Sequence, residues 1–129
     1  MENKSYNSMV KVLADMNNEA KFQVATLSGR DGLLVASSAT NGDNPAKQSA
    51  VVAKLVEATN LMHSQLAFGA PAQLSFSSED GRRLICRPFS MNGQELILAV
   101  LIPNRRQPYR HATNRAIALL RNIWLEQQK

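Results

Sequence analysis

The chain has 129 residues, 44% of them hydrophobic, with a formal net charge of +5 and a sequence pI near 9.8. A chain of this length buries roughly two-thirds of the surface that its unfolded form exposes, so residues 1–129 are expected to fold as one domain, with a core over about residues 6–124. The single Cys86 excludes an intramolecular disulfide, so we expect the protein to reside in a reducing cytoplasm. The longest apolar run, residues 96–102, is far shorter than the roughly 20 residues that span a bilayer, so we expect no direct membrane insertion.

The first third of the chain predicts a helix followed by a β-hairpin. Apolar residues recur at three- and four-residue steps from Tyr6 to Met16, which predicts an amphipathic helix that ends near Asn17. Residues 22–27 then change towards a period of two, and the glycines and aspartate of residues 29–32 suit a tight turn before a return strand over residues 33–37.

A long helix is predicted over residues 45–66, because Asn44 is a good N-cap and Pro45 suits the first helical position, while residues 68–71 end the helix with Gly69 and Pro71. This helix carries two apolar stripes where a helix on a single core needs one. The first stripe consists of Val51, Leu55, Ala58, Met62 and Leu66. The second stripe consists of Val52, Val56, Thr59 and His63. The first stripe is expected to face the sheet, and the second is expected to face a partner.

Three strands and a helix complete the predicted order. Strands are expected over residues 73–77, 82–89 and 95–102, and the dipeptide at residues 92–93 is Asn-Gly, which is typical of a two-residue hairpin. The last strand is apolar at every position from residue 96 onward, so it is expected to be central and covered on both faces. A final amphipathic helix is predicted to begin at Pro108. The fold class is therefore α/β (α+β), with the element order α-β-β-α-β-β-β-α and helices on both faces of the sheet.

The sequence carries no pattern of catalysis or of metal binding. Its six glycines build no phosphate-binding loop, and no Gly-x-Ser-x-Gly elbow is present. His63, Cys86 and His111 stand in different elements without the paired spacing of metal ligands. We therefore expect no enzymatic activity, no metal and no cofactor.

A cluster of basic residues late in the chain supports an alternative function. Arg105, Arg106, Arg110 and Arg115 form a candidate basic patch for nucleic acid or an anionic surface. The aromatic residues that would stack on bases are missing from this face, since Tyr109 and Trp124 belong to the apolar stripe of the last helix. A solvated basic face that maintains solubility is the simpler interpretation.

The order of these elements and three local patterns resemble the roadblock family, which includes dynein light chains and bacterial regulators of Ras-like GTPases. The patterns are ATLSGRDGLLVAS, LSFSSEDGRRLICRPF and ELILAVLIP, and the resemblance covers residues 6–124. The segment before the last helix departs from it, because members often carry an apolar residue and glycine where this chain has residues 105–110, RRQPYR.

The resemblance implies a three-layer α/β/α sandwich around a five-stranded antiparallel sheet, and a homodimer in which the long helices lie side by side and the third strands pair. It implies a non-catalytic dimeric scaffold or regulator that binds a small Ras-like GTPase and modulates GTP hydrolysis. The implied dimer interface consists of Val52, Val56, Thr59, His63, Gln73, Ser75 and Ser77. The implied GTPase-binding surface consists of Ala50, Ala53, Lys54, Glu57, Asn60, Leu61 and Ser64. The alternative that these last positions are ordinary solvent-facing helix formers stays open.

Overall fold

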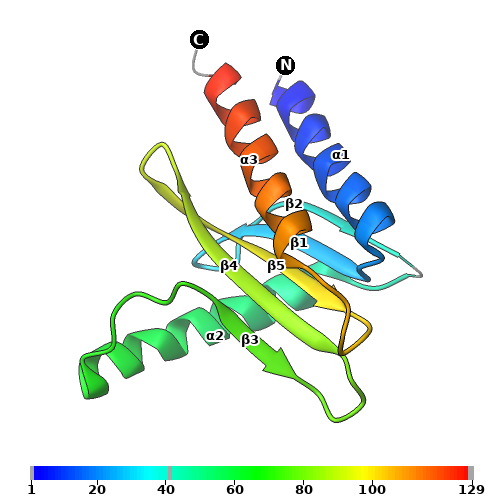
Figure 1. The fold of residues 1–129 in the computed structure, drawn as a ribbon. Coiled ribbons are helices and arrows are strands. Elements are labelled where there is room, and N and C mark those ends of the chain that lie inside the picture. The colour runs from blue at the N-terminus through cyan, green and yellow to red at the C-terminus, as the bar shows by residue number, and fades with distance from the viewer. Residues whose placement is uncertain (1, 41, 128–129) are drawn as a thin grey trace.

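The structure is a computed structural model that describes residues 2–40 and 42–127. Its elements are α1 (Glu2–Ala20), β1 (Val24–Gly29), β2 (Leu34–Ala39), α2 (Pro45–Leu66), β3 (Leu74–Ser77), β4 (Arg83–Met91), β5 (Gln94–Ile102) and α3 (Arg110–Gln127). The strands form one antiparallel sheet in the order β2-β1-β5-β4-β3. As Figure 1 shows, α2 covers one face of the sheet, and α1 and α3 cover the other. The predicted fold class and element order are confirmed.

The central strand β5 is buried on both faces, as its unbroken apolar run predicted. Its even-numbered residues, Leu96 to Ile102, belong to the apolar cluster beneath α1 and α3. Ile97 and Ala99 point the other way and belong to the cluster beneath α2. The sheet therefore separates two cores, and β5 contributes to each of them because successive strand side chains alternate between faces.

The bounds of α2 agree with the sequence, and its N-terminus is capped as expected. The side-chain oxygen Oδ1 of Asn44 accepts a hydrogen bond from the backbone N–H of Ala46 at 2.9 Å. The C-terminal end differs in detail, because Ala67, rather than Gly69, adopts the left-handed conformation with φ of 54°. The helix thus ends where the sequence indicated, but at Ala67, for which a positive φ is energetically unfavourable.

The other boundaries differ by a few residues. The helix α1 extends to Glu2 and Ala20, beyond the predicted residues 6–17, because its first residues are polar and carry no apolar period. The helix α3 begins at Arg110, two residues after Pro108. Asn92 and Gly93 form the expected hairpin turn, with φ values of 51° and 81° and with Met91 opposite Gln94.

The strand β3 lies at one edge of the sheet. It pairs with β4 on one side, from Leu74 opposite Cys86 to Ser77 opposite Arg83, and no described strand pairs with its other side. Leu74 is half-buried and the other three residues of the strand are exposed. The edge therefore presents unpaired backbone N–H and C=O groups.

Candidate functional site

The structure buries most of the second stripe of α2 on the sheet and leaves most of the first stripe exposed. Val52 and Val56 of the second stripe are buried on the sheet against Cys86, Ile97 and Ala99, with exposures of 0% and 7%. Thr59 is buried as well, and its hydroxyl donates to the carbonyl of Val56 at 2.6 Å. The assignment of Val52, Val56 and Thr59 to a helix seam between two copies was therefore wrong, because these side chains are already covered by the sheet of their own chain.

The first stripe is the exposed one. Val51 is 49% exposed, Met62 36% and Leu66 68%, while Ala58 is exposed and Leu55 half-buried. The prediction that this stripe faces the sheet was wrong for all of these residues except Leu55, which packs at the margin of the core beneath α2. A continuous line of apolar side chains therefore remains uncovered along one flank of α2.

Two contacts on the other residues of α2 set its rotation about its axis. The side-chain amide of Gln48 donates to the carbonyl of Ala99 and to the hydroxyl of Thr26, both at 3.2 Å, which directs this side of the helix to the sheet. On the flank opposite the first stripe, the β1–β2 turn approaches so closely that a Cβ on Gly32 would lie 2.8 Å from the Cβ of Ala53. Together these contacts hold the second stripe against the sheet.

His63, the last member of the second stripe, is exposed near the C-terminal end of α2. Its Nδ1–H donates to the backbone carbonyl of Phe68 at 2.7 Å. This bond closes the turn that follows the helix. His63 therefore contributes to the structure of the helix end, and its expected place in a dimer interface stays a prediction.

The first stripe continues into an uncovered part of the sheet. Val51 lines a shallow groove with Leu84 of β4 and Leu101 of β5. Phe76 of the edge strand, 46% exposed, lies opposite Leu84 in the β-ladder. Exposed apolar side chains and the unpaired edge of β3 thus adjoin.

The three residues of the predicted third strand that were expected at a dimer interface differ in their surroundings. Ser75 and Ser77 are exposed on the edge strand. Gln73 precedes the strand, is half-buried, and donates from its side-chain amide to the hydroxyl of Tyr109 at 2.7 Å. The Gln73 side chain therefore holds the start of β3 to the start of α3.

On the opposite flank of α2, most of the expected GTPase-binding surface forms one groove of about 590 Å³ between the helix and the β1–β2 turn. Its lining residues are Arg30, Asp31, Ala50, Ala53, Lys54, Val56, Glu57 and Asn60. Arg30 pairs with Glu95 at 3.0 Å, and Lys54 lies 4.0 Å from Glu57. Leu61 and Ser64 are exposed further along the helix. The sequence pattern missed Arg30 and Asp31, since helical periodicity says nothing about the turn that packs beside the helix.

The late arginines mostly interact within the chain. Arg105 donates to the carbonyl of Glu79 at 3.3 Å, and Arg115 lies 3.9 Å from Glu19. The guanidinium of Arg110 lies 5.9 Å from the centroid of the Tyr109 ring, and Arg106 is exposed. The four residues of the expected basic patch therefore divide between the β5–α3 connector and α3.

The surroundings of Cys86 and the placement of potential metal ligands limit the chemistry that they support. Cys86 is buried in β4, and burial raises the pKa of its thiol to about 12, so the thiol stays protonated near neutral pH. Among residues 2–40 and 42–127, no three His, Cys, Asp or Glu side chains gather in a metal-binding group. No helix in this part of the chain combines the length and the apolar character that crossing a membrane requires.

Comparison with solved structures shows which fold this is. The chain is similar to the gliding protein MglB of Thermus thermophilus, with a TM-score of 0.75 and 19% identity over 95% of this chain and 92% of that chain. It is also similar to Myxococcus xanthus MglB, with a TM-score of 0.75 and 14% identity over 94% of this chain and 90% of that one. A roadblock/LC7 domain from Streptomyces avermitilis matches with a TM-score of 0.70 and 15% identity over 93% and 98% of the two chains. No protein-family model matches the sequence, and no curated protein is significantly similar to it. The chain therefore has the roadblock/LC7 fold.

Proposed function

We propose that this protein is a non-catalytic, cytoplasmic, dimeric scaffold or regulator that binds a small Ras-like GTPase and modulates its GTP hydrolysis. The observation that carries the proposal is the exposed first stripe of α2 beside the unpaired edge of β3. The roadblock/LC7 fold supports it, as does the name of one structural neighbour, an MglB with a tetrameric arrangement, because that protein self-associates.

In the proposed homodimer, the first stripe of α2 forms the seam between the two α2 helices, whereas the sequence had suggested the second stripe. Burying Val51, Met62 or Leu66 against a second copy would contribute about 1.5–3 kcal/mol each as an upper estimate. Ser75 and Ser77 would lie in the strand that pairs with its twin, where the backbone groups of the edge find hydrogen-bond partners.

The GTPase would bind on the opposite flank of α2. Small alanines at positions 50 and 53 allow close approach, and Leu61, 62% exposed, offers an apolar anchor. Charged groups of both signs, from Arg30 to Glu57, surround the groove and favour a polar partner surface. Hydrolysis would change through ordering of the GTPase's own switch loops.

The test uses small GTPases recovered from the native cell by affinity capture, then purified and loaded with GTP. We expect Leu61→Asp to weaken binding at least about tenfold, which corresponds to about 1.4 kcal/mol. The matched control is Leu125→Asp, at a comparably exposed leucine on α3 in the other helical layer. Binding is measured by titration calorimetry and hydrolysis by phosphate release. Equal binding by wild type and Leu61→Asp would remove the proposed surface, and failure to recover any small GTPase would remove the proposed function.

A further inference from the structure

Four arginines gather where α3 crosses β4, and we call this set the arginine seam. Arg83 and Arg87 belong to the strand, and Arg110 and Arg121 belong to the helix. The two helical arginines are three turns apart, so the seam is about 16 Å long. The proposed dimer and the proposed GTPase surface both use α2, on the other face of the sheet, and neither of them accounts for the seam.

One end of the seam is organised around Tyr109, the residue before α3. The guanidinium groups of Arg83 and Arg110 lie 5.5 Å and 5.9 Å from the centroid of its ring. The hydroxyl of Tyr109 accepts a hydrogen bond from Gln73 at 2.7 Å. The half-buried ring is therefore already engaged on its edge and beside both guanidinium groups.

The rest of the seam follows α3 along the strand. The Nη1 atom of Arg87 donates to the hydroxyl of Thr113 at 2.8 Å. Two helical turns further on, the Nε atom of Arg121 donates to the carbonyl of Ser90 at 3.2 Å. These contacts place the arginines of the strand and of the helix in one continuous line.

The seam contains no acidic side chain that neutralises it. The strands β3 and β4 and residues 110–125 of α3 include no Asp or Glu. None of the four arginines forms an ion pair with a carboxylate of residues 2–40 and 42–127. Arg83 and Arg87 donate only to neutral oxygens, and their Nε atoms are buried without an acceptor in this part of the chain. The seam therefore concentrates positive charge that the chain itself leaves uncompensated, which favours an anionic ligand.

The sheet beside the seam is open on the same side. Ser77 of β3 lies opposite Arg83 in the β-ladder, and Ser75 shares its face because alternate strand residues point the same way. Both serines are exposed, and in Figure 1 α1 and α3 leave this face of β3 uncovered. A chain that lies along the seam would therefore find hydroxyl groups beside the guanidinium groups.

The spacing of the arginines fits an extended polypeptide. Arg83 and Arg87 are four residues apart on a strand, which corresponds to about 13 Å. In an extended chain, every second side chain points the same way at steps of about 6.6 Å, so carboxylates at alternate positions would match both arginines. A guanidinium group binds a carboxylate through two parallel hydrogen bonds, which adds geometric selectivity to the attraction of charge.

Other polyanions match the seam less well. Arg83 and Arg87 are half-buried, so a flat anionic membrane would reach only the exposed Arg110 and Arg121. Single-stranded nucleic acid binds proteins largely through bases stacked on aromatic rings, and Tyr109 already makes other contacts. A narrow acidic chain reaches all four arginines and needs no stacking partner.

We propose that the arginine seam binds an acidic segment of a partner protein, in an extended conformation and with carboxylates at alternate positions. Only Arg110 belongs both to this seam and to the basic patch expected from the sequence. The seam lies apart from α2, so the proposal does not depend on the proposed function.

The probe is a fluorescent peptide of about ten residues in which glutamate and serine alternate, long enough to cover the seam. Fluorescence polarisation measures its binding. We expect the wild type to bind the peptide, with an affinity that falls as the salt concentration rises. The double variant Arg110→Gln/Arg121→Gln should weaken binding at least about tenfold, because it removes the two exposed charges of the seam. Circular dichroism checks that the variant is folded.

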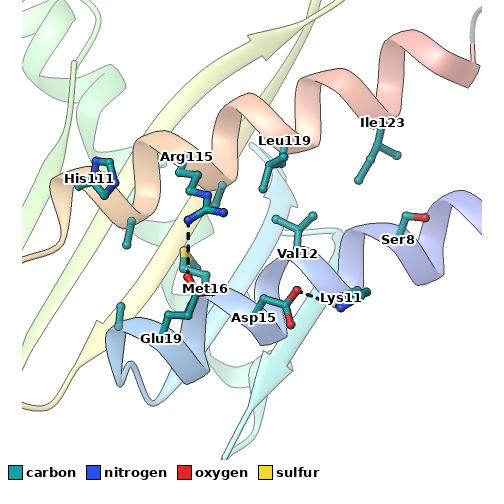
Figure 2. Close-up of a pocket in the computed structure, with 13 residues that line it drawn as sticks. Ser8, Lys11, Val12, Asp15, Met16, Glu19, His111, Arg115, Leu119 and Ile123 are labelled. Atoms are coloured by element: carbon teal, nitrogen blue, oxygen red, sulfur yellow. Dashed lines mark hydrogen bonds and ion pairs between the residues drawn. The ribbon is translucent and has the colours of Figure 1, made fainter.

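A matched control removes the same charge from the other flank of α3. There, Arg115 lines a groove of about 470 Å³ between α1 and α3 and points towards Glu19 of α1, at 3.9 Å, as Figure 2 shows. Lys11 lines the α1 wall of this groove. We expect Lys11→Gln/Arg115→Gln to change the affinity by less than about twofold. Equal weakening by the two double variants would mean that binding follows net charge alone, and would overturn the seam as the site.

A measurement on the wild type locates the peptide without any variant. In nuclear magnetic resonance spectra, the peptide should shift the side-chain Nε–H signals of Arg83, Arg87 and Arg121 and leave that of Arg115 in place. Unchanged signals from the seam, or no binding of the peptide even at low salt, would overturn the proposal. Tighter binding of an oligothymidylate of equal charge, or of phosphatidylserine vesicles, would overturn the assignment to an acidic protein segment.

Discussion

At the scale of single residues, Gly32 lets the β1–β2 turn pack closely against α2 because glycine has no Cβ. Its φ of 87° lies in the left-handed region, and its Cα faces α2, where an added Cβ would lie 2.8 Å from Ala53 and 3.3 Å from the carbonyl oxygen of Ser49. Glycine therefore serves both the turn geometry and the close approach of the turn to the helix. Arg30 and Asp31, which line the proposed GTPase groove, depend on this approach for their place beside α2.

Replacing Gly32 by alanine should therefore cost more than the same change in an open turn. Gly93 is the matched control, because its φ of 81° is nearly the same and nothing lies within 4 Å of its added Cβ. We expect Gly93→Ala to lower the free energy of unfolding by about 1 kcal/mol and Gly32→Ala by a further 1–3 kcal/mol or so. Urea unfolding of the two variants measures the difference. Equal losses would show that the turn does not press on α2.

At the scale of elements, α2 is a helix with apolar residues on two neighbouring sides, only one of which meets its own sheet. Val52 and Val56 fill the small core beneath it, and Gln48 anchors the same side by hydrogen bonds to Ala99 and Thr26. Val51 and Met62 remain outside. One helix thus contributes both to the stability of the chain and to its proposed assembly, through side chains only one position apart.

Truncating adjacent valines should separate these two contributions. Val52→Ala leaves a cavity under α2 and should lower the free energy of unfolding by about 2 kcal/mol, whereas Val51→Ala should change it by less than about 0.5 kcal/mol. The comparison requires urea unfolding at a dilution where the proposed dimer has dissociated. A larger loss for Val51→Ala than for Val52→Ala would contradict this rotation of α2 about its axis.

At the scale of the whole molecule, the sheet divides the surface into two sides with different apolar features. The α2 side carries the first stripe and the β3 edge, and the other side carries the groove between α1 and α3. Exposed apolar side chains lie at both places, with Val51 on the α2 side and Leu119 on the other. Of the late arginines, Arg105 donates to the carbonyl of Glu79 and Arg115 lies 3.9 Å from Glu19, and the candidate basic patch stays a prediction.

Assembly along α2 should depend on the first stripe and on no residue of the GTPase flank. Val51→Asp places a charge in the proposed helix seam, so its assembly should have half the mass of the wild-type assembly, counted in protomers of 14.2 kDa. Leu61→Asp should leave the mass of the assembly unchanged. Light scattering at matched concentrations measures both. A halved mass for Leu61→Asp instead would move the seam to the other flank of α2.

The sequence by itself determined the elements, their order and the class of the fold. The cap at Asn44 defined where α2 begins, the Asn-Gly turn at residues 92–93 defined a hairpin, and the apolar run of β5 identified the strand buried on both faces. These features are local, since each depends on residues within a few positions of one another. Periodicity also identified the two stripes of α2, because it sets the angles between side chains on one helix.

Only the tertiary structure decided which stripe faces the sheet. Two apolar stripes on one helix are equivalent until something distant in sequence sets the rotation, and here Gln48 reaches Ala99 in β5 while Gly32 places the β1–β2 turn against Ala53. The groove between α1 and α3 has the same origin, since its walls lie about a hundred residues apart in sequence. Surfaces of this kind arise from the packing of elements against one another, which the pattern within a single element does not contain.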